Sequence, residues 1–170
     1  MKFSNLLPDI YLKSIDDIDF EQYKKNGIKG IITDVDNTIV PHDAPADEHA
    51  IKYFQMLHDM GIDTCILSNN DEPRVEPFAT KVNSKYIYKG GKPGFKGYKK
   101  AMDAMGTDVD STLFIGDQIF TDIWGANRAG LANVMVEKID PHEEIQIVLK
   151  RIPEKFIMWR YRRRLKKQSK

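Results

Sequence analysis

The sequence has little cysteine: Cys65 is the single thiol among 170 residues. One cysteine gives no disulfide framework and is compatible with a reducing cytoplasm, where we expect the protein to be located. Cys65 lies in an apolar segment and is predicted to be a small buried hydrophobic residue. Because 170 residues can bury a proper core without covalent or metal cross-links, the length predicts one globular domain.

Long hydrophobic runs are also lacking. The first eight residues do not contain the apolar stretch of a signal peptide, and no window reaches the length of a transmembrane helix. No internal repeat and no low-complexity tract is present. The four histidines do not have the spacing of metal ligands: His42, His49, His58 and His142. Because of these absences, we expect neither a secreted protein stabilised by disulfides nor a chain that spans a membrane.

The most informative segment is Asp34-Val35-Asp36-Asn37-Thr38, which follows a β-branched strand predicted over residues 28–33. Chains leaving the carboxyl end of a parallel sheet present side chains to the crevice where ligands bind. Two carboxylates so close repel each other, so a cation or hydrogen-bond donors should lie nearby. One of them can act as nucleophile and the other as acid and base. The alternative is an Asx-rich turn that only ends the strand.

Three more polar elements follow predicted strands. Ser68 comes after the apolar strand 63–67, and Lys92 comes after 86–88. The string Gly-Asp-Gln-Ile-Phe-Thr-Asp at 116–122 follows the strand 112–115. Taken singly, a serine is commonly a strand-ending turn and a lysine a solvated surface residue. The chain order of the four elements is therefore what indicates a site.

The remaining pattern alternates helices with strands. Helices are predicted over residues 45–61, 95–105 and 121–129, and a fifth strand over 133–136. Pro77 should shorten or kink a further helix between residues 72 and 82. Such alternation predicts an α/β fold of three layers with a mostly parallel sheet.

The ordered motifs resemble the haloacid dehalogenase (HAD) superfamily of aspartate-nucleophile phosphatases, whose sites read DxDx[TV], a lone Ser or Thr, a Lys, and a closing acidic pair. The resemblance covers about residues 6–140 and implies a three-layer α/β/α, Rossmannoid HAD-like fold. The Lys92-Pro93 pair, the string at 116–122 and the opening Leu6-Leu7-Pro8-Asp9 are similar to subfamily III phosphatases of the bacterial YqeG type. Those resemble the phosphatidylglycerophosphate phosphatases of mitochondria and plastids.

The resemblance implies a role for each motif residue. Asp34 would be the nucleophile that forms an aspartyl phosphate, and Asp36 the acid and base. Ser68 would hydrogen-bond the phosphoryl group, with Asn69 beside it as a second substrate-binding residue. Lys92 would offer positive charge to Asp34 and to the phosphoryl oxygens.

The resemblance also implies a Mg²⁺ cofactor. Asp34, the backbone carbonyl of Asp36 and Asp117 would bind the ion, because Mg²⁺ prefers hard oxygen ligands and keeps several waters. Asp122 would either bind the ion directly or hold a metal-bound water. Thr38 is expected to stabilise the turn.

The spacing of the motifs leaves no room for a cap domain. Only 33 residues separate Asp34 from Ser68, and only 23 separate Ser68 from Lys92. The site should therefore be open, which suits a bulky substrate or an oligomer whose neighbour covers the crevice. Candidate substrates are a lipid headgroup, with phosphatidylglycerophosphate implied by the resemblance, a nucleotide, a sugar phosphate or a phosphoprotein.

Charge is distributed unevenly along the chain. Residues 150–170 hold ten basic side chains and one acidic one, whereas the other 149 residues hold 16 basic and 24 acidic ones. We predict a core over 1–150, with an N-terminal extension over 1–26, and a basic amphipathic tail over 151–170. The tail could lie on the anionic inner face of a membrane, bind RNA, or pack as a helix on the acidic core.

Two functions of different class follow. The first is a Mg²⁺-dependent phosphomonoester hydrolase. The second is a protein that docks on RNA, a ribosome or a membrane through its tail, with a phosphate-recognising core of low turnover. The intact pair Asp34 and Asp36 favours the enzyme, because binding alone needs no nucleophile.

Overall fold

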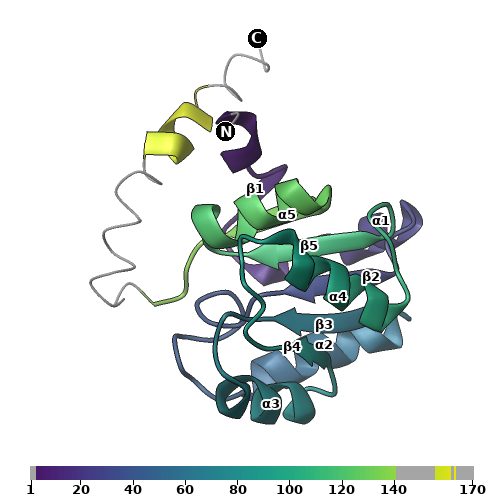
Figure 1. The fold of residues 1–170 in the computed structure, drawn as a ribbon. Coiled ribbons are helices and arrows are strands. Elements are labelled where there is room, and N and C mark those ends of the chain that lie inside the picture. Colours follow the sequence, from purple (N-terminus) through teal and green to yellow (C-terminus); the bar gives the residue numbers. More distant parts are fainter. Residues whose placement is uncertain (1–2, 141–155, 162, 164–170) are drawn as a thin grey trace.

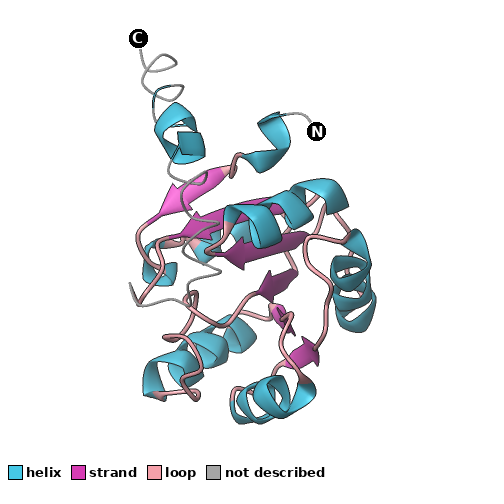
Figure 2. Cartoon of the chain, turned by 60° about the vertical axis from the view of Figure 1, so that its left-hand side comes forward, coloured by secondary structure: helices cyan, strands magenta, loops and turns pink. Residues whose placement is uncertain are grey.

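A computed structural model describes residues 3–140, 156–161 and 163. Six strands form one sheet in the order β1-β6-β5-β2-β3-β4, and all of their pairings are parallel (Figures 1 and 2). The strands are β1 Ile10–Leu12, β2 Gly30–Thr33, β3 Asp63–Leu67, β4 Lys85–Ile87, β5 Thr112–Gly116 and β6 Ala132–Val136. The predicted parallel sheet is confirmed.

Helices connect the strands and have marked ends. They are α1 Phe20–Lys25, α2 Glu48–Asp59, α3 Glu72–Lys81, α4 Phe95–Met105 and α5 Trp124–Ala129, with shorter turns η1 Phe3–Leu6, η2 Ile15–Asp17 and η3 Ile119–Ile123. The Asp47 carboxylate accepts from the Ala50 N–H at 2.7 Å and caps α2. Gly106 and Gly130 end α4 and α5 in the left-handed conformation, which suits glycine.

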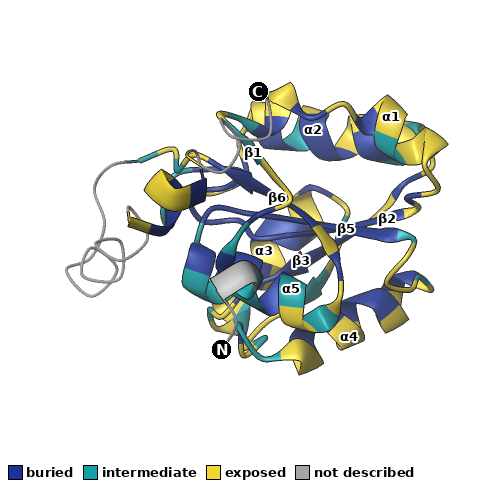
Figure 3. Cartoon of the chain, turned by 90° about the horizontal axis from the view of Figure 1, so that it is seen from above, coloured by how far each residue is buried: buried dark blue, intermediate teal, exposed yellow. Residues whose placement is uncertain are grey.

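The core lies on both faces of the sheet, because successive strand residues point to opposite faces. Ile31 packs in the cluster under α1, α2 and α3, whereas Ile32 packs in the cluster under α4 and α5. Figure 3 shows α1 and α2 on one side of the strands and α4 and α5 on the other, with buried surfaces facing inward. The three-layer α/β prediction is confirmed.

Three features differ from the sequence pattern. The N-terminal region supplies a sixth strand, β1, which pairs with β6 and is too short to show a clear alternation. Helix α3 runs for ten residues through Pro77, so the expected shortening does not occur, while the kink stays a prediction. The expected helix over 121–129 begins as the π-helical turn η3 and becomes α-helical at Trp124.

Part of the predicted tail is a helix packed on the core, at residues 156–161, while the tail residues 151–155, 162 and 164–170 lie outside the described residues. Its buried side chains, Ile157, Met158 and Tyr161, join a cluster with Leu6, Ile119, Ile123 and Met135. Figure 1 shows this helix beside η1 at the edge of the domain. Packing on the core, one of the three alternatives, is thus observed. Across the described residues, no helix combines the length and the hydrophobicity needed to cross a membrane.

Candidate active site

The predicted motifs converge because their strands are neighbours in register. Thr33 at the end of β2 pairs with Ile66 of β3 on one side and Ile115 of β5 on the other. Asp34 extends this ladder, with its N–H donating to the Ile115 carbonyl at 3.0 Å. After β2 the chain adds β3 and β4 on one side and then crosses to β5 on the other. Ligands bind at the carboxyl ends of strands where the order reverses in this way.

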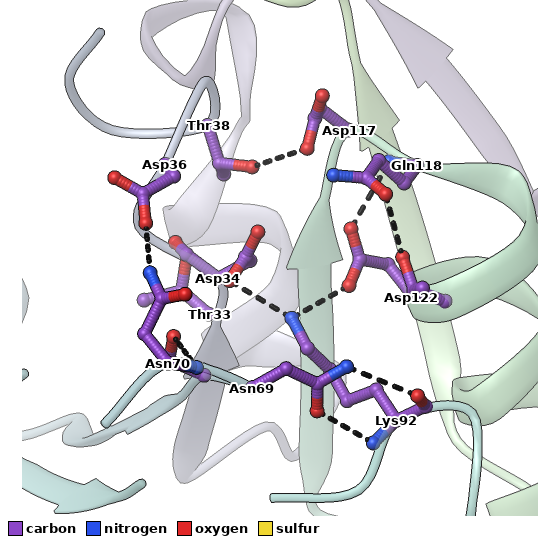
Figure 4. A network of polar contacts seen from close by, with 12 residues as sticks. Thr33, Asp34, Asp36, Thr38, Asn69, Asn70, Lys92, Asp117, Gln118 and Asp122 are labelled. Atoms are coloured by element: carbon purple, nitrogen blue, oxygen red, sulfur yellow. Dashed lines mark hydrogen bonds and ion pairs between the residues drawn. The ribbon is translucent and has the colours of Figure 1, made fainter. Parts of the chain in front are cut away.

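Lys92 lies between two buried carboxylates at the centre of this edge (Figure 4). Its Nζ is 2.8 Å from Asp34 Oδ1 and 2.7 Å from Asp122 Oδ1. All three side chains are at most 9% exposed, so the ion pairs are hardly screened by water. Lys92 therefore holds the Asp34 carboxylate in a fixed orientation.

The turn after β3 holds Lys92 in place. The Asn69 side chain donates to the Lys92 carbonyl at 3.0 Å and accepts from the Lys92 N–H at 2.8 Å. Both ends of the Asn69 amide are thus engaged with the Lys92 backbone, so a direct contact with substrate stays a prediction. Ser68 is buried in the same turn, and its Oγ accepts from the Asn70 N–H at 3.1 Å.

Three carboxylates gather beside Lys92. Ligand oxygens of Asp34, Asp117 and Asp122 all lie within 4.8 Å of one another, and all three residues are buried. Burial raises the pKa of Asp34 to about 7, and the charges of Asp122 and Asp36 also raise it while Lys92 lowers it. Three buried carboxylates with one lysine leave an excess of negative charge, which a divalent cation would compensate. The all-oxygen donor set fits Mg²⁺.

The turn after β5 shapes the acidic pair. Asp122 Oδ2 accepts from the Gln118 N–H at 3.0 Å, and the Tyr98 hydroxyl donates to the Asp122 carbonyl at 3.0 Å. A Cβ atom on Gly116 would lie 2.8 Å from the Asp122 carboxylate, so the close approach requires glycine there. The Thr38 hydroxyl donates to Asp117 Oδ1 at 3.4 Å, a contact that joins the first motif to the last.

Asp36 faces a different set of partners. Its Oδ1 accepts from Arg74 Nη2 at 2.7 Å and from the Asp43 N–H at 2.9 Å, while its Oδ2 accepts from Asn70 Nδ2 at 2.7 Å. Figure 4 shows its carboxylate turned toward Asn70, away from the Lys92 cluster. Sequence reasoning missed Asn70 and Arg74. The available signal was their position, in the turn that follows Ser68 and in the first turn of the next helix.

The structure therefore brings together every predicted site residue at one edge of the sheet. Asp34, Lys92, Asp117 and Asp122 form the buried centre. Asp36 and Ser68 line a narrow crevice next to it, together with Val35, Arg74, Val75 and Phe78. A parallel α/β sheet with an acidic pair, a hydroxyl, a lysine and a second acidic pair at this edge is the arrangement of a HAD-like phosphotransfer enzyme.

The chain belongs to the haloacid dehalogenase-like hydrolase family, whose sequence model matches residues 41–130. It is 40% identical over 131 residues to the probable phosphatase YqeG of Bacillus subtilis (strain 168), with 76% of each protein covered. It is 25% identical over 159 residues to the chloroplastic/mitochondrial phosphatidylglycerophosphate phosphatase 1 of Arabidopsis thaliana, covering 84% of this chain and 44% of that protein. These comparisons confirm the expected enzyme class, a phosphatase of this family.

A solved structure supports the fold. The 3-deoxy-D-manno-octulosonate 8-phosphate phosphatase of Moraxella catarrhalis, determined with magnesium, phosphate and the sugar acid, superposes with a TM-score of 0.50 at 17% identity. The match covers 72% of this chain and 76% of that one. The family model starts after Asp34 and Asp36, so the roles of these two residues rest on their sequence motif and position.

Proposed function

We propose that this protein is a Mg²⁺-dependent phosphomonoester hydrolase that works through an aspartyl phosphate on Asp34. The observation that carries the proposal is the buried Asp34–Lys92–Asp122 arrangement beside Asp117. A nucleophile held against one lysine, among carboxylates suited to a divalent ion, is what attack on a phosphoryl group needs.

The reaction has two halves. In the first, an Asp34 oxygen bonds to phosphorus, the bond from phosphorus to the leaving oxygen breaks, and Asp36 gives its proton to that oxygen. In the second, Asp36 takes a proton from a water whose oxygen attacks phosphorus, and the bond to Asp34 breaks to release phosphate. Lys92 and the Ser68 hydroxyl would bind the phosphoryl oxygens throughout, because both lie at the buried centre or its adjoining crevice.

Mg²⁺ would be held by the Asp34 and Asp117 carboxylates and the Asp36 carbonyl, and would supply positive charge against the phosphoryl oxygens. The solved structure of the Moraxella catarrhalis phosphatase, which has a similar fold, contains magnesium, and this is consistent with the assignment. The two Asp122 oxygens accept from Lys92 and from the Gln118 N–H. That engagement favours the indirect role for Asp122, in which it orients Lys92 and a water.

For the substrate we propose phosphatidylglycerophosphate. The Arabidopsis relative is named for this lipid, and the intervals 34–62 and 68–84 contain α2 and α3 and no other folded element. Without a domain inserted there, a bulky lipid headgroup can reach the carboxyl edge of the sheet. A nucleotide, a sugar phosphate or a phosphoprotein would be an alternative occupant of the same open site.

For the tail we propose contact with an anionic membrane. Phe156 and Trp159 are 58% and 50% exposed on the helix face opposite the core, and their rings stack at 5.8 Å. The Arg163 guanidinium lies 4.7 Å from the Trp159 ring centre. The stack occupies one face of each ring, and Arg163 lies against Trp159, which leaves less ring surface for the base stacking that RNA binding uses, whereas aromatic edges and arginines suit a lipid interface.

The test is phosphate release from phosphatidylglycerophosphate, nucleotides, sugar phosphates and an aryl phosphate, by wild type and by Asp34→Asn. We expect Mg²⁺-dependent release that disappears with Asp34→Asn and with EDTA. If a folded wild-type protein releases nothing while the double variant Phe156→Ser, Trp159→Ser abolishes its cellular function and Asp34→Asn does not, the docking protein is the correct function.

A further inference from the structure

Arg74 is a cation next to the site that the reaction above does not use. It lies in the first turn of α3, and its side chain is only 20% exposed. Its Nη2 donates to Asp36 Oδ1 at 2.7 Å and to the Ala44 carbonyl at 2.9 Å. The guanidinium is also 5.8 Å from the Phe78 ring centre, so its plane is held by packing as well as by hydrogen bonds.

One edge of this guanidinium is incompletely satisfied. Arg74 Nε is buried and has no hydrogen-bond partner within the described part of the chain. Its nearest anion is Asp43 Oδ1 at 3.5 Å, on a side chain that is 69% exposed. Leaving a buried donor unpaired costs about 1–3 kcal/mol, and such a group in a native structure calls for an explanation.

The unsatisfied edge has the geometry of an anion site. Nε and Nη2 point to the same side of a guanidinium and together bind a phosphate or carboxylate through two parallel hydrogen bonds. Here that edge is shared between Asp36 and the exposed Asp43, so two carboxylates occupy the place of a bound anion. An incoming ligand would displace only the loosely held Asp43, so it would be bound by Nε and by the guanidinium charge while Nη2 keeps its contact with Asp36.

The edge also lies on the appropriate side of the reaction. Arg74 lines the same crevice as Asp36 and Ser68. Under the proposed mechanism Asp36 protonates the leaving oxygen, so Arg74 lies beside the leaving group and not beside the transferred phosphoryl group. A leaving group without a negative charge would offer Arg74 no anion to bind.

We propose that Arg74 binds a second phosphate on the leaving group, so that the preferred substrates are phosphomonoesters whose alcohol carries a phosphodiester. This inference rests on the proposed function and narrows its substrate class. Phosphatidylglycerophosphate is one member, but its water-soluble headgroup without acyl chains has the same two phosphates. The recognised chemistry is the second anion, whichever source supplies it.

The experiment compares two soluble substrates that differ in that anion: glycerol phosphate, and glycerol phosphate whose other end carries a glycerophosphoryl group. Phosphatidylglycerophosphate in detergent micelles is the lipid arm. The variants are Arg74→Gln and Arg74→Lys. Lys89→Gln is the matched control, because Lys89 is an exposed cation on a neighbouring loop that pairs with Asp71 at 3.0 Å.

Wild type should favour the substrate with two phosphates. Arg74→Gln should lower the ratio of the two kcat/KM values by about 10- to 100-fold, mainly through KM, as expected for losing one charge-assisted hydrogen bond. Arg74→Lys should lie between, since it keeps the charge without the Nε donor. Lys89→Gln should leave the ratio unchanged. The lipid arm should follow the soluble one.

An unchanged ratio in Arg74→Gln would overturn the inference, and so would equal losses on both substrates, which a merely structural role through Asp36 would produce. A loss confined to the lipid arm would also overturn it. Binding of the two-phosphate ligand to Asp34→Asn, with and without Arg74→Gln, gives an answer that does not need turnover. If wild type hydrolyses nothing but this binding still weakens about tenfold or more, the proposed function fails and the anion site stands.

Discussion

At the scale of single residues, Asp34 combines burial with a shifted proton affinity. Its pKa is raised to about 7, first because burial disfavours the charged form and then because Asp122 and Asp36 repel it. A metal ion binds the deprotonated carboxylate, so binding must displace a proton whenever the pH lies below that pKa. The affinity for Mg²⁺ should therefore rise as the pH rises through 7.

From pH 6 to pH 8 the apparent Mg²⁺ affinity is expected to increase about tenfold, because one group of pKa about 7 changes from mostly protonated to mostly ionised. Calorimetric titrations at the two pH values, in buffers of different ionisation enthalpy, would also count the released proton. Equal affinity and no proton release would mean that Asp34 is ionised before the metal binds.

At Gly116 the site leaves no space for a Cβ atom. A Cβ atom there would meet the Asp122 carboxylate at 2.8 Å, so Gly116→Ala must displace the group that holds Lys92. We expect kcat to fall at least about tenfold, since small displacements of positioning groups are costly. Circular dichroism should show an intact fold. Unchanged kcat would show that Asp122 need not approach this closely.

At the scale of elements, the helix over 156–161 has one buried and one exposed face, and the proposed membrane contact concerns the exposed one. Ile157 is 5% exposed and packs on the core, whereas Phe156 and Trp159 are at least half exposed. The double variant Phe156→Ser, Trp159→Ser should lose affinity for vesicles containing phosphatidylglycerol and keep its free energy of unfolding. The reason is that the interface would lose its two aromatic anchors while the core stays packed.

Ile157→Ala is the matched control, because it should lower the free energy of unfolding by about 2–5 kcal/mol and leave the aromatic face in place. Vesicle sedimentation with neutral and anionic lipids would measure the first effect, and chemical denaturation the second. If the double variant binds anionic vesicles as well as wild type, the exposed aromatic face is not the membrane contact.

At the scale of the whole molecule, three buried carboxylates lie close together, one just after β2, one just after β5 and one within η3, so their mutual repulsion opposes the packing that brings these elements together. Mg²⁺ at about 100 times its dissociation constant should stabilise the native state by about 2.7 kcal/mol. Thermal unfolding with Mg²⁺ and with EDTA would measure the difference. Asp117→Asn should remove most of this stabilisation, and a variant that kept it would place the ion elsewhere.

Much of the architecture was predictable from local patterns. Five strands and four of the helices follow from β-branched runs, helical spacing and glycine ends, as at Gly106. Strand β1 was missed because three residues carry too little periodicity, and it is stabilised by pairing with β6. Pro77 did not interrupt α3, because Val75, Phe78 and Ala79 bury the helix against the core and tertiary packing outweighs propensity.

The sequence by itself determined the family, the parallel fold and the identity of the motif residues, because each motif is a short run that comes within a few residues after a strand. Only the tertiary structure decided which side chains meet. In the structure Asp36 accepts a hydrogen bond from Arg74, and the Asn69 amide bonds to the Lys92 backbone. The buried face of residues 156–161 packs against η3. These contacts join residues far apart in the chain, so they depend on strand order and register, which no local pattern encodes.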